Sequence, residues 1–476
     1  MALNNINAAT QTDFAALSPS NIAQMWEKAM HDGVIQKEWL SRFEGPASSG
    51  RSVIAVKDDL TAGGGDKINF TVGSALVGDG VRGSTAILGF EEKQKLHTFQ
   101  MQVDWVRNAT GTDKRFEGFT AAKRKYSYGV MLQEWMARKK EIDALLRLVK
   151  SGGHTATGIA NNLFYAGGGV AEASLTKSNV LDTGVFYQAR PKLATLGARP
   201  VNLSKEAGYE YPMFVLFATT DALTGLQNDS AWLNANLMAR PREGGADAKN
   251  PLFSGAFSGK TFNGITPYEY MLPDHDNPES GAIGCPLQPR ALLRTATTSF
   301  VDVTEINGGG SNGSGTSIKY FRDFPGYDYP FTSDAAAVVD GTTYYAKIKD
   351  VSGANAGKFE VVSYVGSTGN NGNKLTVTRG SAVDGVSTHT TGAHPADSII
   401  TPCNASGVEY SYVIVAGAMA LLRGYGKIKE RLTSDKQDYE FVNGVGIESI
   451  FGQTPAQRRD GKFPNFVLAK VALPNQ

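Results

Sequence analysis

The stretch from Val53 to Asn108 constrains the fold of this chain more than any other segment. Apolar residues occupy every second position in two short runs, Ile68, Phe70 and Val72, then Phe99, Met101, Val103 and Trp105. Alternation with a period of two residues is typical of a strand with one buried face. Glycines and charged residues separate the two runs. The stretch therefore predicts a long β excursion with little core of its own, anchored on one strand over Phe99–Trp105.

Length, charge and cysteine content set the outer limits. The chain has 476 residues, which suits two or three domains. Its 47 basic and 46 acidic residues leave a net charge of +1, so composition gives no strong attraction to nucleic acid or to an anionic membrane. We expect the thiols of Cys285 and Cys403 to be free in a reducing compartment. We find no signal-peptide pattern and no apolar run as long as a membrane helix.

The first 50 residues read as an arm with two short helices. Ser20 is suited to cap the first helix, and residues Val34 to Phe43 fit the second. Each helix carries a tryptophan, Trp26 and Trp39, although the arm has no core of its own. These side chains pack either on the main body of the chain or on another subunit, and the sequence leaves both alternatives open.

A long helix is expected from Asp113, as its N-cap, to Lys150. Gly118 and Gly129 weaken its first half and predict a kink or a late start. Basic and acidic residues are interleaved along this segment. That pattern favours a solvated face over a face turned to packaged nucleic acid or to an acidic neighbour.

The segment from about 155 to 290 predicts a mixed α/β domain, and the same texture returns after Cys403. The continuous apolar run Met213–Ala218 predicts a central strand buried on both faces. The other expected elements are helices over Asp182–Gly197, Asp221–Leu226, Ser230–Met238 and Tyr412–Arg423, and strands over Gly264–Tyr270 and Phe466–Leu473.

Residues 297–402 differ in composition from the rest. Gly308–Gly315 is a flexible linker by composition. Three β-type runs follow, at Thr342–Ile348, Lys358–Val365 and Lys374–Arg379. We expect a small all-β insert with its two ends close together, since the parent domain continues beyond it. The aromatic run Tyr320–Phe331 is a sugar- or partner-binding surface or the core of this insert, and the need of a small β module for large side chains favours the core.

Motifs for catalysis and cofactor binding lack the context that they need. Gly78–Gly83 matches the dinucleotide pattern G-x-G-x-x-G, but a β-prone segment follows where a helix is required. Gly309–Gly313 matches G-x-S-x-G without the apolar strand of a nucleophile elbow. His389 and His394 have no further Cys/His cluster beside them, so we expect solvated loop histidines. The sequence therefore predicts no catalytic, cofactor-binding or metal-binding residues, no cofactor and no enzyme.

Several short segments, taken in order, resemble one protein family. They are Gly65–Phe70, Leu76–Gly83, Gly89–Glu92, Trp105–Arg107, Asn250–Ala256, Asp438–Tyr439 and Gly446–Ile447. Their order and spacing are similar to those in the major capsid proteins of tailed bacteriophages, in the branch that includes the coat protein of coliphage N-four. The resemblance covers roughly 45–290 and 405–476. Phe90 departs from the polar residue expected at its position.

This resemblance implies an α+β fold of the Hong-Kong-97 type with an all-β insertion domain. It divides the chain into an N-terminal arm (1–50), an extended β loop (51–95), a peripheral domain (96–180) with a spine helix (113–150), an axial domain (181–296), the insertion domain (297–402) and a return to the axial and peripheral domains (403–476).

The resemblance also implies a structural function in the virion. Copies made in the cytoplasm of a bacterial host would assemble, as hexamers and pentamers, into an icosahedral head shell around double-stranded DNA. The implied partners are neighbouring subunits through the arm and the extended loop, packaged DNA through weak non-specific contact, and a cement or decoration protein, with no membrane. The contact candidates are Lys67, Arg82, Glu91 and Glu92 of the loop, and Trp26 and Trp39 of the arm. The alternative is a surface adhesin or glycan-binding protein that acts through the aromatic insert.

Overall fold

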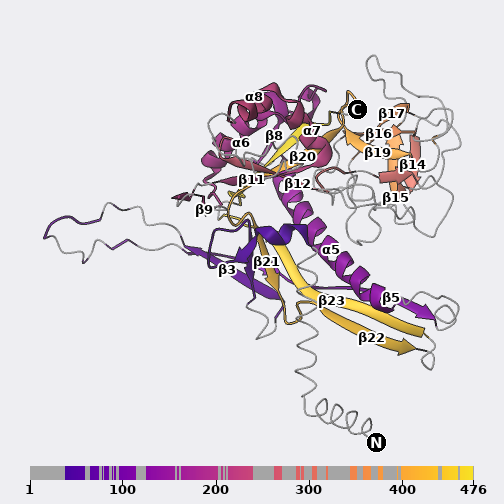
Figure 1. Ribbon diagram of the computed structural model, residues 1–476, viewed down its shortest axis with the longest axis horizontal. Coiled ribbons are helices and arrows are strands. Elements are labelled where there is room, and N and C mark those ends of the chain that lie inside the picture. Colours follow the sequence, from indigo (N-terminus) through magenta and orange to yellow (C-terminus); the bar gives the residue numbers. More distant parts are fainter. Residues whose placement is uncertain are drawn as a thin grey trace, which may run out of the picture. The chain divides into compact units, whose positions relative to one another are not determined.

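The computed structural model forms two compact units (Figure 1). The first contains Met1–Pro46, Val56–Glu141 and Leu422–Thr454, and the second contains Ala47–Ala55, Ile142–Leu421 and Pro455–Gln476. The structure describes residues 38–58, 65–73, 78, 80–84, 88, 91–92, 96–113, 125–155, 158–159, 162–201, 205–206, 209–210, 213–239, 262–270, 286–289, 291–293, 303–307, 318–319, 343–350, 357–365, 374–378, 394, 398–437, 442–458 and 461–474.

The first unit is built on a six-stranded sheet. Its strand order is β1 (Glu44–Pro46), β2 (Ile54–Lys57), β21 (Leu421–Tyr425), β23 (Val442–Pro455) and β22 (Arg431–Gln437), with β5 (Asp104–Asp113) also paired to β23. The 3-10 helix η1 (Trp39–Phe43) precedes β1. The long strands β5, β23 and β22 lie side by side in Figure 1.

Helix α5 (Lys125–Gly153) covers one face of this sheet. Its Leu132, Met136 and Ala137 form a buried cluster with side chains of the sheet, namely Tyr425, Ile447 and Phe451. The expected N-cap, Asp113, is wrong, because Asp113 is the last residue of β5 and pairs with Val442. The described helix runs from Lys125, and residues 114–124, which include Gly118, lie outside the described part of the chain.

A two-stranded ribbon, β3 (Lys67–Gly73) with β4 (Leu96–Gln102), carries the predicted alternation. Ile68, Phe70 and Met101 are buried, and the rings of Phe70 and Phe99 stack at 5.4 Å. The single strand predicted over Phe99–Trp105 is wrong, because the chain breaks at Val103, whose N–H donates to the Asp66 carbonyl. The break reverses the faces of the following strand, which leaves Trp105 50% exposed.

A five-stranded sheet forms the centre of the second unit. Its order is β12 (Ile265–Tyr270), β11 (Phe214–Thr219), β20 (Tyr410–Ala416), β24 (Phe466–Ala472) and β8 (Leu163–Tyr165). Strands β20 and β24 are buried along their whole length. This confirms the central strand predicted near Met213–Ala218 and the strands predicted over Gly264–Tyr270 and Phe466–Leu473.

Helices α6 (Thr183–Leu196), α7 (Thr220–Asn228) and α8 (Ser230–Ala239) lie beside this sheet (Figure 1). Asp182 caps α6 by accepting from the Val185 N–H at 3.1 Å, and Gly197 ends it in the left-handed conformation at φ 75°. All three helices confirm the sequence prediction. The remaining short elements of the unit are η2 (Ala166–Gly168), η3 (Glu172–Ser174), and the strand pairs β6 (His154–Thr155) with β7 (Gly158–Ile159) and β9 (Lys205–Glu206) with β10 (Tyr209–Glu210).

The helix predicted over Tyr412–Arg423 is wrong, because this segment forms the end of β20 and most of β21. Its continuous apolar run fits either a buried helix or a doubly buried strand, and length and periodicity do not separate the two. The β-branched residues Val413, Ile414 and Val415 favour a strand. Gly417 follows β20 directly. A Cβ there would lie 2.3 Å from the Arg199 carbonyl oxygen, so this close approach requires glycine.

The segment Ala291–Cys403, called the insert below, forms a seven-stranded sheet. The order is β14 (Val303–Asn307), β18 (Lys374–Thr378), β17 (Phe359–Val365), β16 (Thr343–Lys349), β19 (Ile399–Cys403), β13 (Ala291–Leu293) and β15 (Ile318–Lys319). The three predicted β runs correspond to β16, β17 and β18. Strands β13 and β19 pair directly, so the chain enters and leaves this sheet on neighbouring strands.

Gly452 of β23 lies very close to the backbone of Gln102 and Val103, at the end of β4. A Cβ there would lie 2.2 Å from the carbonyl oxygen of Gln102 and 3.2 Å from the Cα of Val103. Backbone atoms cannot move away as a flexible side chain can. We expect Gly452→Ala to lower the unfolding free energy by about 1–3 kcal/mol, measured by urea denaturation of the subunit.

Gly129→Ala in α5 is the matched control. A Cβ at Gly129 meets only Leu432 Cδ1, at 3.9 Å. Alanine in a helix is favoured over glycine by about 0.5–1 kcal/mol, so this variant should be neutral or slightly more stable. Equal losses in the two variants would contradict the close approach at Gly452.

Candidate subunit-contact surface and its buried anchor

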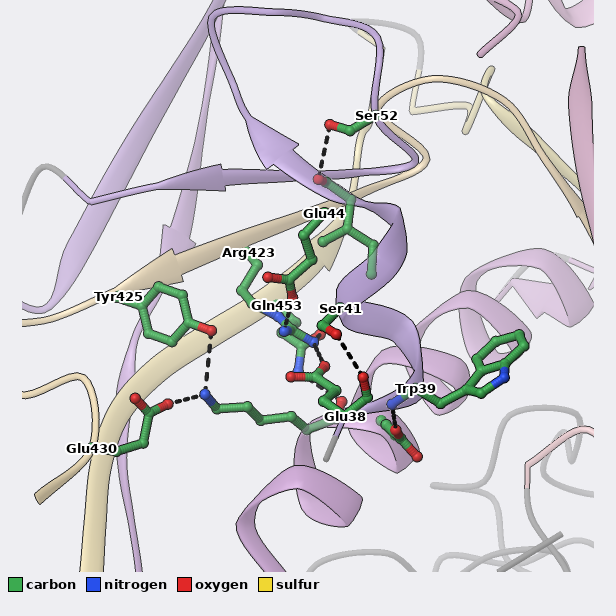
Figure 2. A network of polar contacts seen from close by, with 12 residues as sticks. Glu38, Trp39, Ser41, Glu44, Ser52, Arg423, Tyr425, Glu430 and Gln453 are labelled. Atoms are coloured by element: carbon green, nitrogen blue, oxygen red, sulfur yellow. Dashed lines mark hydrogen bonds and ion pairs between the residues drawn. The ribbon is translucent and has the colours of Figure 1, made fainter. Parts of the chain in front are cut away.

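Arg423 of β21 is fully buried and holds the end of the N-terminal segment on the first unit. Its Nη2 donates to Glu38 Oε1 at 2.5 Å and to Gln453 Oε1 at 3.3 Å, and its Nη1 donates to Glu44. Figure 2 shows the guanidinium among these three side chains. Because an unpaired charge in a protein interior is costly, each carboxylate fixes the backbone segment that carries it.

Lys140 of α5 forms the second centre of the same network. Its Nζ donates to Glu430 and, at 3.2 Å, to the hydroxyl of Tyr425. The ammonium also lies 4.7 Å from the centre of the Tyr425 ring. Gln453 joins the two centres, because its Nε2 donates to the Lys140 carbonyl at 3.0 Å while its Oε1 accepts from Arg423. The network therefore ties η1, α5, β21 and β23 together.

The network stabilises the protonated, charged forms of Lys140 and Arg423. Burial opposes the charge of Lys140, but attraction to Tyr425, Glu430 and Glu38 outweighs it and raises the pKa of Lys140 above its ordinary value. Burial likewise opposes the charge of Arg423, and Glu38 leads the groups that raise its pKa. Burial raises the pKa of Tyr425 to about 12, although Lys140 and Arg423 lower it.

Trp39 is held on this anchor and keeps part of its surface open. The backbone N–H of Trp39 donates to the carboxylate of Glu141 in α5. The guanidinium of Arg42 lies 5.0 Å from the Trp39 ring centre, and Arg42 Nε donates to the Trp39 carbonyl at 3.1 Å. Trp39 is thus held on its own unit in part. Packing on another subunit was the other alternative, and the open part of Trp39 leaves it in place. Trp26 lies outside the described residues.

The charged candidates of the loop all lie exposed on or beyond the ribbon. Lys67 begins β3, and Arg82, Glu91 and Glu92 lie in the connection between β3 and β4. Glu92 accepts from the Gly78 N–H at 2.7 Å, which closes part of this connection. Sequence reasoning missed two leucines beside them, Leu88 at 86% and Leu96 at 65% exposed.

Sequence reasoning also missed the buried anchor. Arg423 stands inside the apolar segment Leu421–Tyr425, and a lone charge in such a run was the available signal. Lys140 was counted with the interleaved polar face of the helix, yet it is fully buried. Periodicity alone does not distinguish a solvated lysine from a buried, paired one.

The prediction of a solvated loop histidine is wrong for His394. This side chain is buried, with Nδ1 2.7 Å from Asp350 Oδ1 and Nε2 2.7 Å from Glu360 Oε2. Both ring nitrogens are therefore used by carboxylates. Within the described residues no group of His, Cys, Asp and Glu is suited to hold a metal ion. Cys403 is a free, buried cysteine, while His389 and Cys285 lie outside the described ranges.

Comparison with known proteins assigns the chain. The family model described as phage capsid protein matches residues 20–270, which is more than half of the sequence. This chain belongs to the phage capsid protein family. No curated protein matches it in sequence. The family is one of structural shell proteins, and the protein is a component of the virion.

Solved capsid structures share its fold. The capsid of Ralstonia phage GP4 is 14% identical, with a TM-score of 0.52 over 91% of each chain. The capsid of cyanophage Pam1 is 14% identical, with a TM-score of 0.51 over 89% of this chain and 90% of that chain. The capsid of Helicobacter pylori bacteriophage KHP30 is 10% identical, with a TM-score of 0.50 over 92% and 91%.

The capsid protein therefore has the α+β fold of the Hong-Kong-97 type and serves as a major capsid shell protein. The adhesin or glycan-binding alternative has no support from the family match or from these structures. In the part of the chain that is described, no helix is long and apolar enough to span a membrane.

Removal of Arg423 tests the anchor. Arg423→Met leaves Glu38 buried without its cation, so we expect the capsid protein to lose about 3–5 kcal/mol of unfolding free energy. The control is Arg431→Met, whose side chain is 49% exposed beside Glu448, where a loss of about 0–1 kcal/mol is expected. Urea denaturation measures both. Similar losses would show that Arg423 is no anchor.

The buried tyrosine and lysine predict an alkaline limit to stability. The Tyr425 hydroxyl has a pKa of about 12 in the fold but titrates near its ordinary value of about 10 in the unfolded chain. The unfolded chain thus loses this proton first, and the contribution is present below about pH 10 and lost between about pH 10 and 12. Lys140, with its raised pKa, acts in the same direction.

We expect the unfolding free energy to be level from about pH 7 to 9 and to fall above about pH 10. Tyr425→Phe should reduce that slope by up to about 1.4 kcal/mol per pH unit, which is the effect of one proton. Denaturation curves recorded across this pH range give both slopes. An unchanged slope in the Tyr425→Phe variant would show that ionisation of Tyr425 does not cause the loss of stability above about pH 10.

Proposed function

We propose that this capsid protein builds an icosahedral shell of hexamers and pentamers in which the β3–β4 ribbon and the N-terminal segment contact neighbouring subunits. The ribbon is the observation that carries the proposal. Among the described strands, β3 and β4 pair only with each other. A two-stranded ribbon is marginally stable in water unless something packs on it.

The ribbon packs on its own unit near its base, where Ile68, Phe70 and Met101 are buried. A Cβ at Gly424 of β21 would lie 2.3 Å from Ile68 Cδ1 and 2.4 Å from Met101 Cε, so the base sits directly on the sheet. Towards the other end, Thr71 and Thr98 are exposed, and so are Leu88 and Leu96. A neighbouring subunit that covered these leucines would supply the burial that the ribbon lacks.

Trp39 and Arg42 fit the second contact. Tryptophan and arginine are the residue types most enriched among those that dominate protein interfaces. The Glu141 bond holds the Trp39 backbone and the Arg42 guanidinium lies over its ring before any partner arrives, which reduces the ordering cost of binding. Trp26 remains a candidate of the same kind.

Shell closure needs contacts of modest strength. Each stable interface buries about 1,200–2,000 Å². Once several neighbours are in place, the last contacts form within one assembly, so weak pairwise affinity suffices. Weak contacts also let a misplaced subunit leave. The exposed charges Arg82, Glu91 and Glu92 suit this role because solvated ion pairs contribute little individually.

The finer assignments follow the resemblance. We propose an arm at 1–50, an extended loop at 51–95, a peripheral domain with α5 as its spine helix, an axial domain around the five-stranded sheet, and the insert as an insertion domain. We also propose membership of the coliphage N-four branch, assembly in the host cytoplasm, weak non-specific contact with packaged double-stranded DNA, and binding of a cement or decoration protein.

Charge reversal on the loop tests the proposal. Glu91→Arg combined with Glu92→Arg should prevent normal shells, because both exposed acidic contacts change sign. Electron microscopy of the expressed protein measures assembly, and circular dichroism checks that the subunit is folded. Glu92→Gln is the matched control, since it keeps an acceptor for the Gly78 N–H and removes only the charge. Normal particles from the double variant would contradict the proposal.

A further inference from the structure

We infer that the insert is held in a fixed orientation on the five-stranded sheet by its two bonded ends and a buried ion pair, so that it is a rigid part of the subunit rather than a tethered module. Three sets of contacts carry this inference: the exit from the insert, the entry to it, and the joint between them. All of them lie within the second unit.

The exit is a short, fully bonded turn. Asn404 follows β19 directly and is buried. Its Nδ2 donates to the Leu175 carbonyl at 2.8 Å, which ties it to the segment that follows η3. Its Oδ1 accepts from the Ser406 N–H at 3.0 Å and from the Val408 N–H at 2.9 Å. Strand β20 begins at Tyr410, so no free linker separates the insert from the sheet.

The entry is pinned in the same way. The Leu287 carbonyl accepts from the Tyr412 N–H at 2.6 Å and from the Ser411 hydroxyl at 3.0 Å. The next residue, Gln288, is buried and donates to Asp221 Oδ2 of α7 at 2.7 Å. Strand β13 starts three residues later, at Ala291. The two ends of the insert are therefore fixed to different elements of the five-stranded sheet and the segments around it. In this subsection, that part of the second unit is called the base.

A buried ion pair links the insert to the base between these two ends. Lys347 of β16 is 3% exposed, and its Nζ lies 2.9 Å from Glu409 Oε1, next to the start of β20. The same ammonium lies 4.3 Å from the ring centre of Phe359 in β17. A tilt of the insert would separate Lys347 from Glu409 and leave two buried charges without partners, which is strongly unfavourable.

A second ion pair lies outside the insert, in the five-stranded sheet and η3, and two tyrosines of β20 lie against its ammonium. Lys470 of β24 contacts Glu172 of η3 at 2.5 Å, and its ammonium lies 4.4 Å from the Tyr410 ring centre. Tyr344 and Tyr364 of the insert stack on each other at 5.8 Å. Burial, then the nearby charge of Glu172, raises the pKa of Tyr364 well above its ordinary value.

The joint has a consequence for recognition. A module on a flexible tether loses orientational freedom when it binds, and this loss weakens binding. An insert fixed at both ends and locked by Lys347 has already lost that freedom during folding. Every copy in a shell then presents the insert at one defined angle, so a partner meets a regular and pre-oriented array.

Distances between spin labels test the inference on the full-length subunit. One label is placed at Thr343→Cys, an exposed position in β16, and the other at Tyr187→Cys, which is 59% exposed in α6. Cys285→Ser removes one native thiol, and buried Cys403 stays unlabelled. The reference pair, Val170→Cys with Tyr187→Cys, lies entirely in the base.

Pulsed electron paramagnetic resonance should give an insert-to-base distance distribution as narrow as that of the reference pair. A broad or multi-peaked distribution in the chain with Lys347 intact would overturn the inference, whether or not any variant folds. Lys347→Met should broaden the distribution, and Lys349→Met, exposed on the same strand, should not. An unchanged width with Lys347→Met would show that this ion pair does not hold the insert.

Discussion

The buried guanidinium of Arg423 is the interaction on which the first unit depends. It satisfies carboxylates from two points of the N-terminal segment and an amide of β23 at once. Gln453 then passes the connection on to α5 through the Lys140 carbonyl. Because any of these groups left alone would be an unpaired charge or polar group in the interior, the segments are stable only as a set.

This rigidity contrasts with the ribbon that the same unit carries. Ile68 and Met101 fix its base over Gly424, whereas Leu88 and Leu96 are left in water. A shell protein benefits from both properties. The anchored base sets the direction of the ribbon, and the exposed part leaves apolar surface open. The insert follows the first pattern, since its Lys347 pairs with Glu409 inside the subunit.

Short-range patterns in the sequence predicted most of the elements. Asp182 and Gly197 marked the ends of α6, and alternation marked β3 and β4, because caps and strand periodicity act within a few residues. The Tyr412–Arg423 error arose where burial on both faces removes periodicity. The anchor was missed for another reason: Arg423 is a lone charge in an apolar run, but its partner Glu38 lies 385 residues away, beyond the reach of any short-range pattern. The loop candidates could be placed from sequence, because the glycines around them predict an exposed connection between two strands.

The separation of Arg423 from Glu38 along the chain, 385 residues, also sets an order of events. During synthesis the N-terminal segment emerges long before the strand that holds it, so for most of that time Glu38 and Glu44 remain in water. The first unit closes only after residues near Gln453 have been made. Long-range closure of this kind is slow compared with the formation of local helices. The N-terminal segment is consequently among the first parts of the unit to be made and among the last to be fixed in place.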